Sequence, residues 1–227
     1  GNITICSSKH DLDMDEDLSI INSNTRNEKI KNFIINNKKS LIILLILFLG
    51  IIISFFGYKE FKKSQTIKIS DDYNSVIINY SNKTKDETIK RLVEIINKKN
   101  STYSPLSLYF ILDNKLISNQ QKINDLFNVL INDTPLEKEI KNLIIYKKGL
   151  YNADKIQENE LLEILRPLIN TKSVWSSHAL YLIAEFFYSK DEKQKAKDFF
   201  NKILEIDKAN QDIIKETRKR LSRDLSD

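Results

Sequence analysis

The longest apolar stretch of the chain runs from Leu41 to Tyr58 and contains no charged side chain, although 30% of all residues are charged. At about 1.5 Å per residue, a helix of this length measures roughly 27 Å, close to the thickness of the hydrocarbon core of a bilayer. Because only a helix satisfies the backbone hydrogen bonds of a lone span in lipid, the pattern predicts one transmembrane helix over 41–58.

A cleaved signal peptide and the buried core helix of a soluble domain are the two other interpretations of this stretch. A signal peptide has an apolar region of about 7–15 residues, followed by small residues at the cleavage site. Here the run is longer, and Tyr58-Lys59-Glu60-Phe61 follows it. These features favour an uncleaved anchor.

Positively charged side chains flank both ends of the predicted span. Those before it are Arg26, Lys29, Lys31, Lys38 and Lys39, and those after it are Lys59, Lys62, Lys63 and Lys68. By this small margin, the positive-inside tendency favours a cytoplasmic N-terminus and an exported C-terminal domain.

Beyond the span, over 59–227, apolar residues recur at the i, i+3, i+4 spacing of helices. Gly149 is the only glycine in this part of the chain, and proline occurs only at 105, 135 and 167. Folds built of strands and turns need more of both residues, so this part is predicted to be all-α. The clearest apolar stripes are Ile89, Leu92, Val93 and Ile96, then Ile123, Leu126, Phe127 and Leu130, and then Leu161, Leu162, Leu165 and Leu168.

Helix start and stop signals separate these stripes. Thr84 and Thr134 each stand three residues before a glutamate, the spacing of a capping box at the start of a helix. Pro105 and Pro135 are expected at the first position of their helices, where the missing N–H is not needed. Pro167 is expected to kink or end the helix that contains it.

These signals divide 59–227 into helices that alternate in pairs with a period of roughly 34–39 residues. The expected helices cover 59–81, 85–99, 104–117, 120–131, 135–150, 158–169, 176–189, 193–206 and 211–225. Such a period is typical of solenoids of helical hairpins, in which each pair buries its apolar face against its neighbours. The predicted fold is therefore all-α, with a single N-terminal transmembrane helix, an α-solenoid of about four helix pairs and a C-terminal capping helix.

The best-formed pair, Ser177–Asn210, resembles a tetratricopeptide repeat of about 34 residues. In such a repeat, small residues let the two helices approach closely and aromatic side chains fill the space beside them. The matching packing positions are Leu180, Ile183, Ala184, Phe187, Ala196, Phe200 and Ile203. The resemblance predicts tetratricopeptide-repeat-like (TPR-like) packing, with an unrelated antiparallel pair as the alternative. The other pairs match only by period and apolar spacing.

The last helix, 211–225, is expected to cap the solenoid with a polar outer face. Its apolar side would contact the repeat through Ile214, Leu221 and Leu225. Its outer face would carry Lys215, Arg218, Lys219, Arg220 and Arg223. Contact of this basic face with anionic lipid is the alternative to a plain cap.

The tail over 1–40 is acidic first and then basic, and it is expected to be largely disordered. Met14 is the only methionine of the chain, so we hypothesise that translation starts there or that the chain is a fragment. The acids from Asp11 to Asp17 lack the turn glycine and distal glutamate of a calcium loop, which argues against a metal site. Cys6 is the only cysteine, which excludes a disulfide within the C-terminal domain and fits a reducing compartment or a periplasm.

The chain shows no pattern of catalytic, cofactor-binding or metal-binding residues. It has no glycine-rich phosphate loop, no paired cysteines and no H-E-x-x-H motif. His10 and His178 lie on opposite sides of the span, and His178 is expected to be a surface or cap residue. The net charge of +5 is interspersed, which favours a solvated surface over a nucleic-acid patch. We therefore predict no enzyme, no cofactor, no metal, no small-molecule substrate and no nucleic-acid partner.

The order of parts resembles a bacterial family of membrane-anchored TPR-like proteins that includes the ancillary subunit of the SecYEG translocon. The strongest local matches are Asp15-Glu16-Asp17-Leu18, Ser104-Pro105, Trp175 and the repeat over 177–210. Members of this family often carry Pro-Trp-Arg where this chain has Val174-Trp175-Ser176. The resemblance implies a cytoplasmic N-terminus, a periplasmic domain, and association with the translocon and with a periplasmic chaperone of the prolyl-isomerase type.

Three functions remain open at this point. The first is a translocon-associated scaffold that links SecYEG to periplasmic chaperones. The second is a general envelope-assembly adaptor, for example in cytochrome or cell-wall machinery, and the third is a membrane-anchored hydrolase. The sequence assigns no residues to a protein-binding groove.

Overall fold

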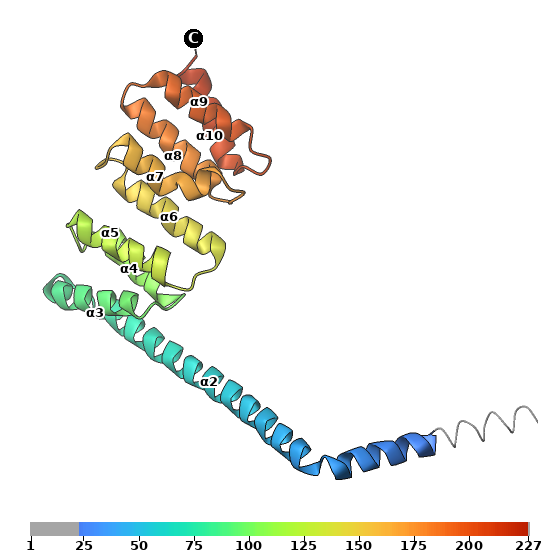
Figure 1. The fold of residues 1–227 in the computed structure, drawn as a ribbon. Helices are drawn as coiled ribbons and strands as arrows, with labels where there is room; N and C mark the ends of the chain where they lie inside the picture. The colour runs from blue at the N-terminus through green and yellow to red at the C-terminus, as the bar shows by residue number, and fades with distance from the viewer. Residues whose placement is uncertain (1–22, 227) are drawn as a thin grey trace, which may run out of the picture. The chain divides into compact units, whose positions relative to one another are not determined.

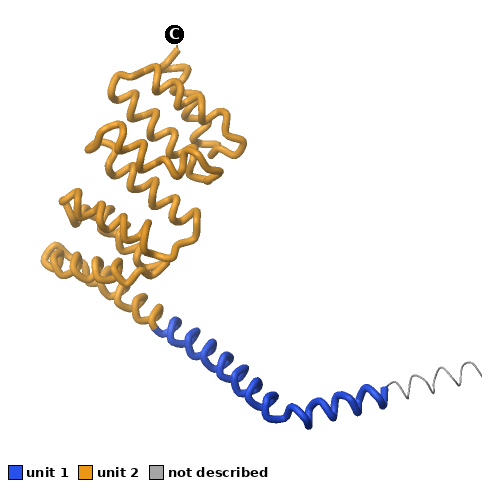
Figure 2. The backbone as a smooth tube through the Cα atoms, in the orientation of Figure 1, with its two compact units in different colours: residues 1–64 blue, residues 65–227 orange. Residues whose placement is uncertain are grey.

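The computed structural model describes residues 23–226, which form helices joined by loops, without any strand. The predicted all-α class is therefore confirmed for this part of the chain. Two compact units, 1–64 and 65–227, divide within the first long helix (Figure 2). The helix over 23–36 is followed by the elements below, of which α2 to α10 are labelled in Figure 1. They are α2 (Lys38–Ile78), η1 (Asn82–Thr84), α3 (Lys85–Asn97), α4 (Tyr103–Asp113), α5 (Gln120–Asn128), η2 (Val129–Asp133), α6 (Lys138–Asn152), α7 (Glu158–Ile169), α8 (Ser176–Ser189), α9 (Lys193–Leu204) and α10 (Gln211–Arg223).

In the first unit, residues 23–36 are helical, so the expectation of a largely disordered tail is wrong for this segment. The apolar residues Ile30, Phe33 and Ile34 have helical spacing, which the overall polarity of the tail obscured. The acids from Asp11 to Asp17, together with Cys6, His10 and Met14, lie outside the described residues.

Helix α2 contains the apolar run 41–58 and is long and apolar enough to cross a membrane. No residue of its most apolar stretch is buried. The helix continues without a break to Ile78, whereas the sequence predicted a separate helix over 59–81. Gly57 has no atom within 4 Å of the place where a Cβ would stand, and one glycine weakens a helix by only about 1 kcal/mol. A single continuous helix therefore forms.

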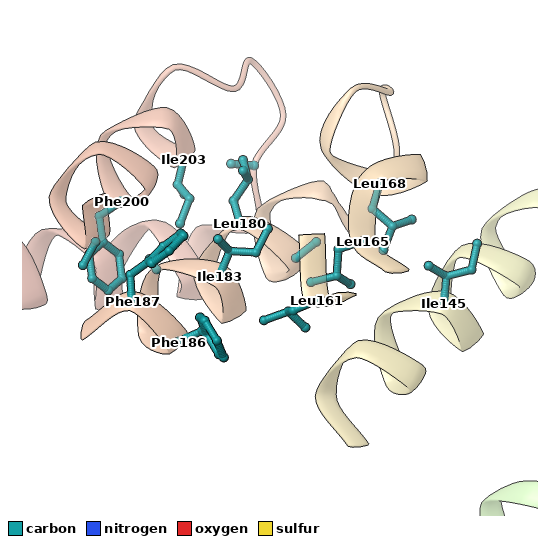
Figure 3. Close-up of a cluster of buried hydrophobic side chains, with 14 of the residues drawn as sticks. Ile145, Leu161, Leu165, Leu168, Leu180, Ile183, Phe186, Phe187, Phe200 and Ile203 are labelled. Atoms are coloured by element: carbon teal, nitrogen blue, oxygen red, sulfur yellow. The ribbon is translucent and has the colours of Figure 1, made fainter. Parts of the chain in front are cut away.

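In the second unit, two clusters of buried side chains lie on either side of α6. Ile144 belongs to the cluster formed with the end of α2, α3, α4 and α5, whereas Ile145 belongs to the cluster formed with α7, α8, α9 and α10. Figure 3 shows Ile145 in the second cluster with side chains of α7, α8 and α9. Adjacent residues of a helix point about 100° apart, so α6 serves as a shared wall between the two clusters.

The most extensive helix contacts join α3 with α4, α6 with α7, and α8 with α9. The pairing of α3 with α4 was not predicted. The predicted alternation paired 59–81 with 85–99, and 104–117 with 120–131, and so placed α3 and α4 in different pairs. A buried hydrogen bond explains part of the difference, because the Ser104 hydroxyl in α4 donates to the Ile95 carbonyl oxygen in α3 at 2.8 Å. Ser104 also accepts from the Asn100 N–H at 2.8 Å, which ties together the turn between the two helices.

The predicted capping boxes are both wrong. Helix α3 begins directly after Thr84, as predicted, but the Thr84 side chain makes no cap hydrogen bond to it. The Thr84 hydroxyl instead accepts from the Ser81 N–H at 3.0 Å, within the short helix η1. The Thr134 hydroxyl donates to the Val129 carbonyl oxygen at 2.9 Å, across the π-helical turn that extends α5. Glu137 caps α6 instead, and its carboxylate accepts from the N–H groups of Glu139 and Ile140.

The two prolines expected at the first helical position are also displaced. Pro105 is the third residue of α4. The side-chain oxygen of Asn100 caps the start of this helix, because it accepts from the N–H groups of Thr102 and Tyr103. Pro135 precedes α6 by three residues. Pro167 lies inside α7, which ends two residues later, at Ile169, as predicted.

Ile214 and Leu221 of α10, and Leu225 just after its end, pack in the second cluster, as predicted. The prediction that Arg220 faces outward is wrong, because this side chain is buried. Its guanidinium lies 4.7 Å from the ring centroid of Tyr188 and 5.4 Å from that of Phe200. The remaining basic residues of this face, Lys215, Arg218, Lys219 and Arg223, are exposed.

Burial of Arg220 is compensated by ion pairs with Glu185 and Asp224. The Arg220 Nε atom lies 2.6 Å from an Asp224 carboxylate oxygen. Hydrogen bonds from Arg223 and then Arg220 hold the pKa of Asp224 down at about 2. Asp224 stands four residues after Arg220, a spacing at which side chains of one helix meet.

Candidate functional site

An open groove of about 500 Å³ lies between α5, α6 and α7. We call it the amide groove, because asparagines from all three helices line it beside two isoleucines and a few charged side chains. Its lining residues are Asn124, Lys148, Asn152, Ile156, Asn159, Glu160, Glu163 and Ile164.

Asn152 organises the floor of this groove and is fully buried. Its side-chain nitrogen donates to Asn124 Oδ1 and to the Lys148 carbonyl oxygen, each at 2.8 Å. Its side-chain oxygen accepts from Gln120 Nε2 at 2.9 Å and from Asn124 Nδ2 at 3.0 Å. The four hydrogen bonds use the whole capacity of one amide, so Asn152 rigidly joins α5 to α6.

Lys148 supplies a positive charge on the wall of the groove. Its ammonium donates to Asn128 Oδ1 at 2.9 Å, which fixes the side chain across α5 and α6. Partial burial lowers the pKa of Lys148 from its ordinary value, because it disfavours the charged form. A second partner with an oxygen acceptor would offset this loss of hydration.

The two carboxylates that line the groove already have local partners. Glu160 accepts from the Gln157 N–H at 3.0 Å and so closes the capping box of α7. Glu163 lies 2.6 Å from the Arg166 guanidinium one turn further along α7. Both carboxylates are therefore engaged by other groups of α7 and are not paired with each other as a general acid and base would be. Among the described residues, no three His, Cys, Asp or Glu side chains are grouped so that they could hold a metal ion.

A polar network fixes the loop before α8. The Ser173 hydroxyl donates to a Glu139 carboxylate oxygen at 2.8 Å, and the Val174 N–H donates to the same oxygen at 3.2 Å. Ser173 Oγ in turn accepts from Asn142 Nδ2 at 3.2 Å and from the Trp175 N–H at 3.1 Å. The network places the indole of Trp175 over α6.

Trp175, Tyr146 and His178 form an aromatic cluster between α6 and α8. Trp175 stacks on Tyr146 with ring centroids 6.0 Å apart, and His178 lies 4.9 Å from Trp175 and 5.6 Å from Tyr146. His178 stands in the first turn of α8, as expected, and its side chain is half-buried against the two rings. Burial lowers its pKa, although the Val174 backbone acts weakly in the opposite direction. The Nδ1 atom is buried and has no hydrogen-bond partner of good geometry.

The seven predicted repeat positions are all buried in the cluster around α8 and α9 and therefore lie in the core rather than in the amide groove. They are Leu180, Ile183, Ala184, Phe187, Ala196, Phe200 and Ile203, none of them more than 4% exposed. Ring stacking of Phe187 on Phe199, with centroids 5.4 Å apart, joins the two helices. Their assignment to tetratricopeptide positions stays a prediction.

Sequence reasoning missed the residues of the amide groove. One signal was present, because Asn152 continues the helical register of the buried residues Ile145 and Gly149. A polar residue in a buried register needs partners, and Gln120 and Asn124 stand one turn apart on α5. Nothing in the chain order shows that these two residues meet Asn152.

Comparison with known proteins gives no relative: no family model matches this chain, and neither does any curated protein or solved structure.

Proposed function

We propose that this protein is a single-pass inner-membrane protein whose C-terminal helical domain is a TPR-like scaffold for protein–protein interaction. In this proposal α2 crosses the membrane, the N-terminus is cytoplasmic and the domain from Lys59 onward is periplasmic. The proposal assigns no catalytic role to any residue. Its support is a helix with a fully charge-free run, followed directly by a helical domain with an open, polar groove.

The amide groove is the observation that carries this proposal. Side-chain amides both donate and accept hydrogen bonds, so they can pair with the backbone of an extended peptide without reading its sequence. Asn159 is exposed at the groove and available for such pairing, while Ile156 and Ile164 offer apolar contact. Because the Asn152 network already orders the wall, binding would require little further ordering of side chains.

The sequence resemblance supplies the proposed partners. As an ancillary translocon subunit, the protein would link SecYEG to a periplasmic chaperone of the prolyl-isomerase type. Anchoring by α2 would raise the effective concentration of the groove near emerging segments, and thus increase apparent affinity without new contacts. A general envelope-assembly adaptor would use the same groove for a different set of partners.

Site-specific photo-crosslinking in native membranes tests this function. A photoreactive residue replaces Asn159 in the groove, and a matched control replaces Gln194, which is exposed on α9 outside it. We expect Asn159 to give crosslinks to translocon subunits or a periplasmic folding factor that Gln194 does not give. Equal crosslinking at both sites would contradict the role of the groove, whereas cytochrome or cell-wall partners would favour the adaptor.

Membrane orientation is tested separately. A reporter fused after Asp227 that is active only in the periplasm should be active, and one that is active only in the cytoplasm should be silent. The reverse pattern would overturn the proposed localisation and with it the assignment of periplasmic partners.

A further inference from the structure

Residues 23–36 form a helix in the first unit that carries four large, exposed apolar side chains, three of them on one face. Ile30, Phe33 and Ile34 are 51%, 60% and 50% exposed, although each is large and apolar. Their i, i+3, i+4 spacing places them on one face of the helix. An exposed face of this kind is favourable only when something removes it from water.

Basic side chains border this apolar face on both sides. At about 100° per residue, Lys29 and Lys31 each lie a quarter-turn or slightly more from Ile30, in opposite directions. Lys31 lines a surface depression together with Ile30 and Ile34. Long lysine stems can lie along apolar surface while their ammonium groups stay in a polar layer. Glu28, Asn32 and the single apolar residue Ile35 lie toward the other side of the helix.

Chain connectivity places this helix beside the predicted span. Asn37 alone separates it from α2, whose apolar run begins at Leu41. The Asn37 backbone and side-chain nitrogens both donate to the Phe33 carbonyl oxygen, at 3.0 and 3.1 Å. The Leu41 N–H donates to the Asn37 carbonyl oxygen at 2.9 Å, so hydrogen bonds run from one helix to the next. If α2 crosses the membrane, residues 23–36 cannot be far from its surface.

We propose that residues 23–36 are an interfacial helix that binds anionic phospholipid at the surface of the leaflet where α2 enters. Its apolar face would insert at the boundary between headgroups and acyl chains, and its lysines would contact the anionic headgroups. An apolar protein partner would explain Ile30, Phe33 and Ile34 but not the lysines on both borders. The inference rests on the proposed membrane span of α2.

Spin labels in nanodiscs test this inference with the full chain. After Cys6→Ser, a single cysteine is introduced as Ile34→Cys on the apolar face or as Asn32→Cys on the opposite face. A third variant, Ile46→Cys, reports on the span itself. For each spin label, the rate of collision with oxygen, which concentrates in lipid, is compared with the rate of collision with a water-soluble nickel chelate. The nanodiscs contain phosphatidylcholine with or without phosphatidylglycerol.

With phosphatidylglycerol present, we expect the label at 34 to collide more with oxygen and the label at 32 to collide more with the nickel chelate. Replacing Lys29 or Lys31 with glutamine should weaken the partitioning of the helix about fivefold for each charge removed. Nickel access at both 34 and 32, with the label at 46 in lipid, would overturn this inference but leave the span intact. Protection of 34 from both reagents would indicate a protein contact and also overturn it. Nickel access at 46 would overturn the span and the inference together.

Discussion

Gly149 in α6 lies directly against Leu165 in α7. A Cβ atom built on Gly149 would stand 2.6 Å from Cδ2 of Leu165, closer than real Cβ atoms approach any neighbour. Leu165 is fully buried, so its side chain must shift within the core to make room for a methyl group. Gly149, the only glycine in 59–227, is therefore the residue that allows α6 and α7 to pack closely.

Gly149→Ala should destabilise the domain. Overpacking against Leu165 lowers stability by about 1–3 kcal/mol, which the higher helix propensity of alanine offsets by up to about 1 kcal/mol. Urea unfolding of the detergent-solubilised chain, followed by circular dichroism, measures the difference. Gly57→Ala is the control, because nothing lies near that position. Equal stability of the two variants would show that the α6–α7 contact tolerates a methyl group.

Asn152→Leu should destabilise the domain by about 2–3 kcal/mol, although leucine is apolar and similar in size. The change leaves the amides of Gln120 and Asn124 without their partners in a half-buried site, and an unmade buried hydrogen bond is costly. Asn159→Ala, at the exposed edge of the same groove, should leave stability within about 0.5 kcal/mol of the parent. The same unfolding assay compares the two, and a larger loss for Asn159→Ala would contradict the proposed network.

Arg220→Ala should lower stability by about 2–3 kcal/mol, because it leaves Glu185 and Asp224 without their cation and removes the guanidinium from two aromatic rings. Arg218→Ala removes the same charge from an exposed position of α10 and should change stability by less than about 0.5 kcal/mol. Thermal unfolding distinguishes them. Similar melting temperatures would place Arg220 in solvent, as the sequence had predicted.

His178 should make stability depend on mildly acidic pH. Burial lowers its pKa in the folded state, so the unfolded chain binds the proton first. Its stabilising contribution is then complete above the unfolded pKa of about 6.5 and is lost as pH falls below that value. His178→Phe keeps an aromatic ring and removes the titration. The stability of the parent should therefore fall more steeply than that of the variant between neutral and acidic pH, and parallel curves would contradict the assignment.

Helix positions and several helix ends followed from the sequence, whereas the capping hydrogen bonds did not. Apolar spacing placed α7, α8 and α10 within a few residues of their observed bounds. The predicted caps failed where a hydroxyl made a hydrogen bond other than the expected one, as at Thr84 and Thr134. Capping boxes describe local possibilities, and the surrounding backbone decides which acceptor the hydroxyl reaches.

The sequence by itself determined the all-α class, the charge-free run within α2 and the buried register of α8 and α9. These depend on composition and on the 3.6-residue period, both of which are local properties. Only the tertiary structure decided that Gly149 meets Leu165, that Asn152 meets two amides of α5, and that Arg220 is buried. Each of these outcomes depends on which residues from distant helices come together, and hydrophobic periodicity marks only the buried face of a helix, not the neighbour that covers it.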